Sequence, residues 1–323
     1  MSEKPEIYYD RTVSADFLSL FTPDGGLSEL VDIAKGGHLV DLQLRAYPHS
    51  RSNRATLYCG LTKFLDITNL GKKYRFSAHS TFMDRGPLVR WMETLTLSQV
   101  IEQKDSLMNY IDDQVRNVAA RFTREGAVQS MLCIHAGSLF SVVDREAVVG
   151  FRNTGIRKTC YSTVRAEVQS GLPKALEGYT WAKKIPAFGG ELDLLAVGHD
   201  GSLLVIEVKP GSNRRGITWA ALQATFYAEL FRAWVDGVGD KVAASAIDRM
   251  LRQRIEIGLS LEPMRKLRTP LQIKPVVAIG GDVDKLGLER LLMVRNVLPS
   301  LRGRSQDLEV WQVNPSVSCE QLG

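Results

Sequence analysis

Two neighbouring apolar segments, 191–197 and 203–209, constrain the fold of this chain more than any other part of its sequence. In each segment every second residue is apolar, which is the side-chain period of a β-strand with one buried face. The opposite faces end in charge, and the charged residues there are Glu191, Asp193, Glu207 and Lys209. We therefore expect two adjacent strands that carry charged side chains at one end.

The connection between these strands, residues 199–201, is predicted to be a three-residue hairpin loop with its final glycine at positive φ. In the register that this loop sets, Asp193 faces Glu207. Two residues further out, Glu191 faces Lys209. A two-residue Asp-Gly turn is the alternative, and it would put the two acids on opposite faces. We favour the three-residue loop because only it gathers the charges on one side.

Two carboxylates opposite each other on paired strands repel, and near-buried carboxylates must be protonated, neutralised or bound to a cation. A divalent metal ion between Asp193 and Glu207 would resolve this conflict. Oxygen ligands with room for waters suit Mg²⁺ or Mn²⁺, and the backbone carbonyl of Val208 could supply a third oxygen. Lys209 could then hold a water or a phosphate oxygen beside the metal. For Glu191, we prefer the role of ion-pair partner of Lys209 to that of metal ligand.

This pattern, an Asp followed after 13 residues by Glu-Val-Lys on adjacent apolar strands, resembles the PD-(D/E)xK nuclease superfamily. The sequence QATFY (223–227) is similar to the Q-x-x-x-Y motif of RecB-like exonucleases in that superfamily. Glu167, followed by Gly-Tyr at 178–179, is placed like the acid that opens the core of these nucleases. The resemblance covers about 158–313, and it departs from the motif where Leu192 replaces proline before Asp193.

The resemblance implies an αβββαβ core with a mixed sheet and a metal-dependent hydrolysis of phosphodiester bonds, of DNA first and RNA as an alternative. It implies that Asp193 and Glu207 bind Mg²⁺ or Mn²⁺ and that Lys209 assists the attacking water. Gln223 and Tyr227 would support the metal site or contact DNA, and Glu167 would be an accessory acid. From the residues alone, core packing explains Tyr227 equally well, and a solvated helix face explains Glu167.

The order of elements predicts a two-domain protein of class α/β. Residues 156–323 form the predicted nuclease domain, with strands alternating with helices in a mixed sheet. The elements expected there are a helix at 158–177, strands at 179–187, 191–197 and 203–209, a helix at 217–235, a strand at 275–279, a helix at 285–302 and a strand at 308–313. Residues 1–155 form a β-rich domain with one long helix, followed by one or two strands at 131–143. That domain would select substrate, regulate or dimerise.

The predicted long helix, 97–122, carries apolar residues at alternating spacings of four and three, interrupted once by Lys104. Thr96 and Gln99 form a candidate capping box at its start. We favour an amphipathic helix that packs on its own domain. A pairing of two copies in a homodimer is the alternative, because one metal site cuts one strand and cutting both strands calls for two sites.

Basic residues follow the second strand of the hairpin, where Arg214 and Arg215 lie in a glycine-containing loop suited to holding DNA phosphates. The chain as a whole has a net charge of +5 and a pI near 9.0, which agrees with a polyanionic partner without requiring one. Trp219, in the helix that follows, is either a core residue or a platform for a base.

Other function classes find little support in the sequence. No apolar run has the length of a membrane helix, and the polar N-terminus lacks a signal-peptide pattern, so we expect a cytoplasmic protein without a membrane partner. The four cysteines lack zinc-site spacing, and no P-loop motif occurs. By analogy, two-part nucleases suggest restriction or antiviral defence. The rival function is a catalytically inactive nucleic-acid-binding or effector-sensing protein that retains the nuclease fold.

Overall fold

A computed structural model describes residues 5–36, 40–47, 52–83, 92–119, 124–135, 139–298, 308–314 and 319–322. The chain divides into two compact units. Unit 1 comprises Met1–Tyr9, Ser138–Ile247 and Pro263–Gly323, and unit 2 comprises Asp10–Gly137 and Asp248–Glu262. In the described part of the chain, no helix combines the length and apolar character that a membrane crossing requires.

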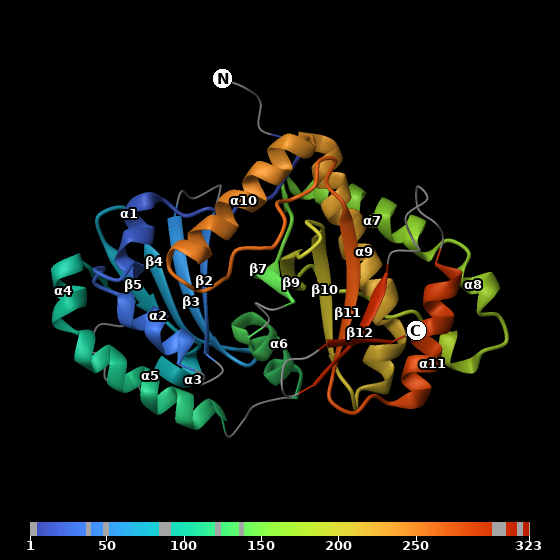
Figure 1. The fold of residues 1–323 in the computed structure, drawn as a ribbon, viewed down its shortest axis with the longest axis horizontal. Coiled ribbons are helices and arrows are strands. Elements are labelled where there is room, and N and C mark those ends of the chain that lie inside the picture. Colours follow the sequence, from blue (N-terminus) through green and yellow to red (C-terminus); the bar gives the residue numbers. More distant parts are fainter. Residues whose placement is uncertain are drawn as a thin grey trace. The chain divides into compact units, whose positions relative to one another are not determined.

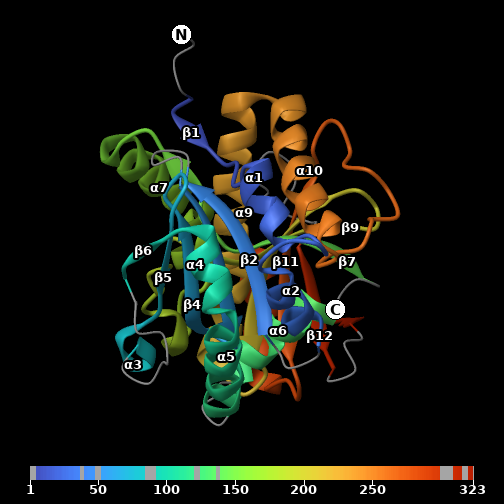
Figure 2. The same cartoon turned by 90° about the vertical axis from the view of Figure 1, so that its left-hand side faces the viewer.

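Unit 2 is built on an antiparallel sheet of five strands in sequential order (Figures 1 and 2). The strands are β2 (Val40–Tyr47), β3 (Ser52–Cys59), β4 (Thr62–Asn69), β5 (Tyr74–Ser77) and β6 (Thr94–Leu95). The accompanying helices are α1 (Ala15–Leu18), the 3-10 helix η1 (Ser19–Phe21), α2 (Ser28–Lys35), α3 (Ser80–Met83) and α6 (Arg124–His135). The strands predicted for the N-terminal region therefore form a sheet, but helices account for more of the described residues of this unit than strands do, so the unit is a mixture of helix and sheet and is not β-rich.

The long helix predicted at 97–122 is in fact two helices, α4 (Leu97–Glu102) and α5 (Lys104–Ala119). Gln103, the C-terminal cap of α4, separates them. The capping box at Thr96 and Gln99 is present. Figure 2 shows both helices in front of the strands. Residues from both helices, including Val100, belong to the same apolar core as the sheet. The packing therefore supports the intramolecular alternative, while Val118 and Phe122 of the predicted seam lie outside the side chains that the structure describes.

Unit 1 contains a six-stranded mixed sheet in the order β13-β12-β11-β10-β9-β7. Its strands are β7 (Phe140–Ala147), β9 (Leu192–Gly198), β10 (Leu203–Pro210), β11 (Ile273–Gly280), β12 (Glu309–Val313) and β13 (Cys319–Gln321). Strands β10, β11 and β12 are parallel, and the remaining pairs are antiparallel. A separate pair joins β1 (Ile7–Tyr8) to β8 (Gly150–Phe151). The predicted mixed α/β sheet is therefore confirmed.

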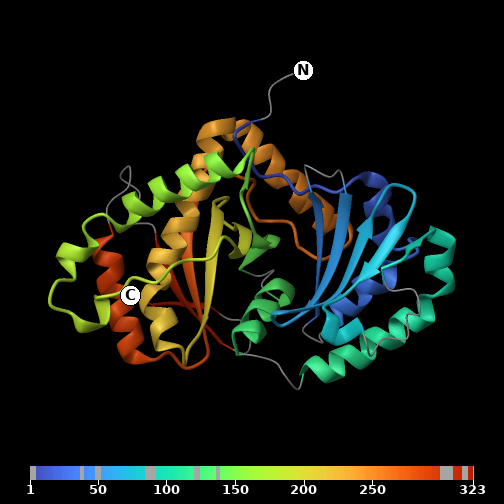
Figure 3. The same ribbon diagram turned by 180° about the vertical axis from the view of Figure 1, so that it is seen from behind.

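A layer of three helices lies on this sheet, with α9 in the middle (Figures 1 and 3). Helix α9 (Arg214–Val238) packs on β10 and β11, with α7 (Thr154–Gln169) and α11 (Lys285–Val297) beside it. Asparagine or aspartate side chains at Asn153, Asn213 and Asp284 cap these helices, as expected for residues that satisfy free backbone amides. The short helix α8 (Leu172–Ala175) follows α7, and α10 (Asp240–Glu256) begins in unit 1 and ends in unit 2.

The strand predicted at 179–187 is wrong. This segment begins with the 3-10 helix η3 (Thr180–Ala182) and forms no strand, and Pro186 within it has no N–H to donate to a neighbour. The sheet position beside β9 belongs to β7, which precedes α7 in the chain. The αβββαβ order expected from the resemblance is therefore not what 158–313 forms.

The division of the chain also differs from the boundary predicted near residue 155. Strand β7 belongs to the sheet of unit 1 because its backbone partners lie in β9. The predicted strand region 131–143 is in fact the end of α6 followed by the start of β7. Conversely, residues 248–262, which were predicted to belong to the C-terminal domain, pack in unit 2. There the Arg254 guanidinium donates to the Leu42 carbonyl at 3.0 Å and lies 3.8 Å from Asp41.

Candidate active site

The β9–β10 hairpin has the predicted register. Backbone pairing runs from Leu203 opposite Val197 to Ile206 opposite Leu194. The loop contains three residues, and Gly201 has φ of +81°. A side chain there would also be crowded, because a Cβ would lie 2.3 Å from the Lys266 carbonyl oxygen. The three-residue loop is therefore confirmed, and one further step of the same register puts Asp193 opposite Glu207.

Asp193 is fixed to β10 by its side chain. Its Oδ2 atom accepts a hydrogen bond of 2.7 Å from the backbone N–H of Val208. The described backbone pairing of β9 with β10 ends at Leu194, one residue short of Asp193. The Asp193 carboxylate therefore accepts the Val208 N–H in place of a backbone carbonyl of β9. The Val208 carbonyl is directed toward the same neighbour, because N–H and C=O of a strand residue face the same side.

Glu207 and Lys209 follow at positions two residues apart on β10 and therefore share a face. Glu207 is 1% exposed and Lys209 is 9% exposed. The Lys209 Nζ atom forms an ion pair with Glu207 Oε1. The partner expected for Lys209 was Glu191, which is instead exposed. A buried carboxylate and ammonium at the end of a strand are costly unless they interact, and here they do.

The pKa of Asp193 is raised above its ordinary value. Burial is the main cause, because it disfavours the charged form of the carboxyl. The positive charge of Lys209, the Val208 N–H, a hydrogen bond with Glu207 and the charge of Arg145 all act in the opposite direction. The net shift shows that these partners do not fully compensate for the loss of water.

Arg145, on β7, is a site residue that the sequence did not reveal. It is fully buried, and it stands opposite Leu194 in the pairing of β7 with β9. Its positive charge acts on the Asp193 carboxyl and lowers the pKa of that group, against the larger effect of burial. The only local signal was the charged run Asp144-Arg145-Glu146, which follows the apolar residues Val142 and Val143 in the same strand. Nothing in the sequence placed that strand beside Asp193.

Gln223 and Tyr227, both predicted site residues, come from α9. Tyr227 is 2% exposed, and its hydroxyl donates a hydrogen bond of 3.2 Å to the Gly189 carbonyl. Its pKa is raised, mainly by burial and next by the negative charge of Glu207, with a further contribution from Asp193. A hydrogen bond with Gln223 acts in the opposite direction. Tyr227 therefore lies beside the two acids and Gln223 beside Tyr227, while their roles at the site stay predictions.

Helix α7 contributes Arg157 and Tyr161, which belong to no motif recognised in the sequence. A Cβ at Gly190 would lie 3.1 Å from the Tyr161 hydroxyl oxygen and 3.4 Å from Arg157 Nη2. The Arg157 guanidinium lies 5.4 Å from the centre of the Tyr161 ring. Burial raises the pKa of Tyr161, and the charge of Arg157 lowers it. The spacing of four residues on α7 was the only signal for this pair.

Glu167 is not part of this group of side chains. It is exposed, and it lines a separate hollow with Glu229, Arg232 and Asp236 of α9. Six residues separate it from Tyr161, which amounts to about 9 Å along the helix and about 240° around it. The solvated-face interpretation of Glu167 therefore agrees better with the structure than the role of accessory acid.

Arg214 and Arg215, the predicted phosphate-binding residues, have different surroundings. Arg214 forms two hydrogen bonds with Asp284, from Nε to Oδ1 at 2.9 Å and from Nη2 to Oδ2 at 3.0 Å. This ion pair joins the first residue of α9 to the N-terminal cap of α11. Among the described residues, Arg215 forms no ion pair and is exposed. Arg215 is therefore better placed to bind a phosphate than Arg214.

The oxygen atoms around Asp193 suit a hard divalent cation. The described residues contain no cluster of three or more His, Cys, Asp and Glu side chains with metal-site geometry. An ion at this place would take oxygens from Asp193 and Glu207, the carbonyl of Val208 and waters, which is the ligand type that Mg²⁺ and Mn²⁺ prefer. A raised Asp193 pKa fits this role, because a bound cation would restore the charged form.

Comparison with family models, with curated proteins and with solved structures gave no match for this chain.

Proposed function

We propose that this protein is a metal-dependent nuclease that hydrolyses phosphodiester bonds of DNA at the site formed by Asp193, Glu207 and Lys209. The supporting observation is the β9–β10 register, which brings two carboxylates and one ammonium together at the end of a buried hairpin. A hairpin with a purely structural role gains nothing from burying these charges, because their desolvation is costly. Such costs are typical of functional sites.

Asp193, Glu207 and the Val208 carbonyl would hold Mg²⁺ or Mn²⁺. When bound, this ion would stabilise charge on the phosphate and lower the pKa of a coordinated water. Lys209 lies on the same face as Glu207, where its Nζ atom would orient the attacking water or hold a phosphate oxygen. Tyr227 acts as a positioning residue, because it holds Gly189 just before the strand that carries Asp193. The buried charge of Arg145 favours the ionised form of Asp193.

The test is incubation of the protein with linear and circular DNA, each single-stranded and double-stranded, in Mg²⁺, in Mn²⁺ and in EDTA. We expect cleavage in either metal and none in EDTA. A parallel set of RNA substrates decides between the two nucleic acids. Lys209→Met, checked for folding by its melting temperature, should retain metal-dependent binding and lose most of the cleavage rate.

The rival function, an inactive nucleic-acid-binding or effector-sensing protein, predicts binding without cleavage under all of these conditions. The role of unit 2 in selecting substrate, in regulation or in forming a homodimer stays a prediction. Sedimentation at micromolar concentration tests the homodimer directly. A monomer under these conditions would restrict each molecule to one metal site and hence to one cut at a time.

A further inference from the structure

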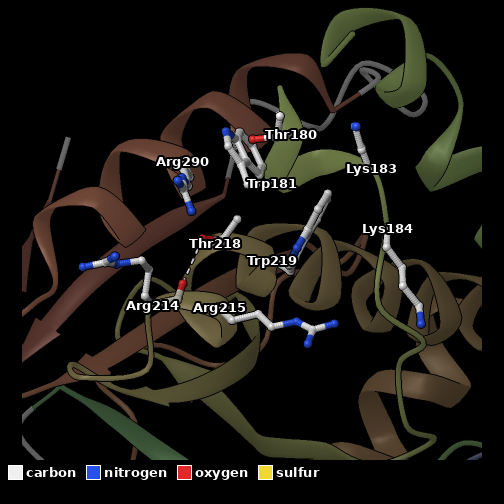
Figure 4. Close-up of a pocket in the computed structure, with 9 residues that line it drawn as sticks. All are labelled: Thr180, Trp181, Lys183, Lys184, Arg214, Arg215, Thr218, Trp219 and Arg290. Atoms are coloured by element: carbon white, nitrogen blue, oxygen red, sulfur yellow. Dashed lines mark hydrogen bonds between the residues drawn. The ribbon is translucent and has the colours of Figure 1, made fainter. Parts of the chain in front are cut away.

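A basic hollow lies in unit 1 between the 180–184 segment, α9 and α11, and its volume is about 360 Å³. Figure 4 shows Arg290 on one side of its two tryptophans and two lysines on the other. The residues that line it are Thr180, Trp181, Lys183, Lys184, Arg214, Arg215, Thr218, Trp219 and Arg290. Five of these are cations and none is an acid. The hollow therefore suits a negatively charged ligand, and its volume is in the range of pockets that bind small molecules.

The cations of the hollow are largely available to a ligand. Arg214 is held by Asp284, but Lys183, Lys184 and Arg215 are exposed and form no ion pair among the described residues. Arg290 lies over the Trp181 ring, with its guanidinium carbon 5.2 Å from the ring centre. Several cations without an acidic partner around one hollow attract phosphate groups, because a phosphate supplies the negative charge that balances them.

The two tryptophans give the hollow an aromatic wall. Trp181 is half-buried and Trp219 is 3% exposed. Their ring centres lie 5.8 Å apart with an angle of 58° between the planes. Because Trp219 is almost completely buried, Trp181 presents most of the aromatic surface, and a group has to enter the hollow to reach Trp219. A nucleobase fits this requirement, since every base has an aromatic face that stacks on tryptophan. Bases inside a duplex are already stacked and would first have to leave it.

Two elements lead from this hollow to the Asp193 site. On α9, Arg215 and Trp219 at the hollow and Gln223 and Tyr227 at the site follow at intervals of four residues, each about 6 Å further along the helix and turned about 40° from the one before. The distance from Trp219 to Tyr227 along the helix is about 12 Å, which is roughly the length of three nucleotides in a stacked strand. The 180–191 segment also connects the two places, because it runs from Trp181 at the hollow to Gly189, whose carbonyl accepts the hydrogen bond of Tyr227.

We propose that this hollow binds an unpaired nucleotide of a single-stranded nucleic acid, with its base against Trp181 and Trp219 and its phosphates on Arg215, Lys183 and Lys184. This inference rests on the proposed nuclease function and specifies its substrate class. The strand would pass from the hollow along α9 to the Asp193 site, so that the bond to be cut lies a few nucleotides from the captured base. Blunt duplex DNA would lack the unpaired base.

The test separates binding from cleavage. Fluorescence anisotropy in EDTA measures the binding of a labelled 12-nucleotide oligo-dT strand, an oligo-U strand and a blunt duplex to the full-length protein. We expect both single strands, or one of them, to bind more tightly than the duplex. Trp181→Ala should weaken single-strand binding about 5- to 140-fold, the range typical for loss of base stacking, and Trp181→Phe should restore most of it.

The charge contribution has its own readout. Arg215→Gln combined with Lys184→Gln should reduce the slope of log affinity against log salt by about 1.4 for a single strand. Matched controls are Trp311→Ala, a half-buried tryptophan of β12, and Lys241→Gln, an exposed cation of α10, which should leave binding unchanged. Melting temperatures identify any variant that fails to fold. If Trp181→Ala fails to fold, the Arg215 and Lys184 double variant carries the test.

Preference for the blunt duplex, or an unchanged salt slope in the Arg215 and Lys184 double variant, would overturn the proposal. So would equal effects of Trp181→Ala and Trp311→Ala in folded proteins. Failure of the nuclease function gives a different result. In that case single strands bind through the hollow in EDTA, but no strand is cut in Mg²⁺ or Mn²⁺.

Discussion

The two ends of the β9–β10 hairpin each carry an aspartate, and the pKa values of the two carboxyl groups are shifted in opposite directions. At the loop, Asp200 Oδ1 accepts hydrogen bonds from the Ser202 N–H at 3.0 Å and from its hydroxyl at 2.6 Å, and Oδ2 lies 2.8 Å from Lys274 Nζ. Burial alone would raise the pKa of Asp200, but these bonds lower it overall. At the open end, burial raises the pKa of Asp193 despite its partners.

The difference shows what each carboxylate does for the protein. Asp200 joins the hairpin loop to β11 through Lys274, and its charged form is the stable one in the fold. Asp193 accepts a hydrogen bond from the Val208 N–H and lies opposite a second carboxyl, and burial raises its pKa despite these partners, so its charged form costs stability. One aspartate thus stabilises the hairpin, whereas the other is tolerated at an energetic cost, as expected for a residue retained for chemistry.

The largest expected difference between the two ends is in catalysis. Asp193→Asn should reduce metal-dependent DNA cleavage by more than about 100-fold, the scale typical of removing a group that acts at the reacting atoms. Asp200→Asn, a matched change in the same hairpin, should leave the rate within about twofold, because it lies at the opposite end of both strands. Initial rates in Mg²⁺ measure both. Comparable losses in the two variants would remove the functional distinction between the ends.

The second difference is the stability contributed by Asp200. Asp200→Asn should lower the free energy of unfolding at pH 7 by about 1 kcal/mol or less, as is typical for a partly exposed ion pair. A carboxyl whose folded-state pKa is lowered stabilises the fold above its unfolded pKa, near about 4, and loses this contribution as the pH falls through the folded value. Urea unfolding at pH 7 and at pH 3 should therefore show a smaller deficit at pH 3.

Asp193→Asn should change the free energy of unfolding with the opposite pH trend, and its effect starts from zero. In EDTA at pH 7, the variant should be as stable as the wild type or more stable by up to about 1 kcal/mol, because it removes one of two repelling charges. A carboxyl with a raised folded-state pKa stabilises the fold most below its unfolded pKa, and this contribution is lost as pH rises through the folded value. The advantage of the variant should therefore grow from pH 3 to pH 7. Marked unfolding of Asp193→Asn would identify Asp193 as a structural residue.

The smallest expected effect concerns Arg214 and Arg215 at the start of α9. As with the two aspartates, one of these residues has a structural ion pair and the other is proposed to bind the substrate. Arg214→Ala removes the ion pair with Asp284 and should lower the melting temperature without changing the salt dependence of DNA binding. Arg215→Ala should leave the melting temperature unchanged and reduce the log–log salt slope by about 0.7 to 0.9, the value of one phosphate contact. If both variants change the slope equally, Arg214 leaves Asp284 to bind the nucleic acid.

The local periodicity of the hairpin was enough to predict its register. Side chains alternate with a period of two, and the 199–201 loop with its glycine at positive φ fixes how the two strands align. The same local reasoning placed Gln223 and Tyr227 on one side of α9, since residues four apart face the same way. The capping box at Thr96 followed from short-range spacing as well. These features depend only on residues close in the sequence.

The neighbours of the hairpin were decided by the tertiary structure. Strand β7, separated from β9 by α7 and α8, lies beside β9, whereas the sequence predicted a strand at 179–187 just before β9, and β7 brings Arg145 to Asp193. The ion pair of Arg214 with Asp284 and the side chains of α7 beside Gly190 depend in the same way on segments far apart in the chain. A repeating pattern reports which face of an element is buried, but not which distant element covers it. That choice is made by the packing of the whole sheet and its helices.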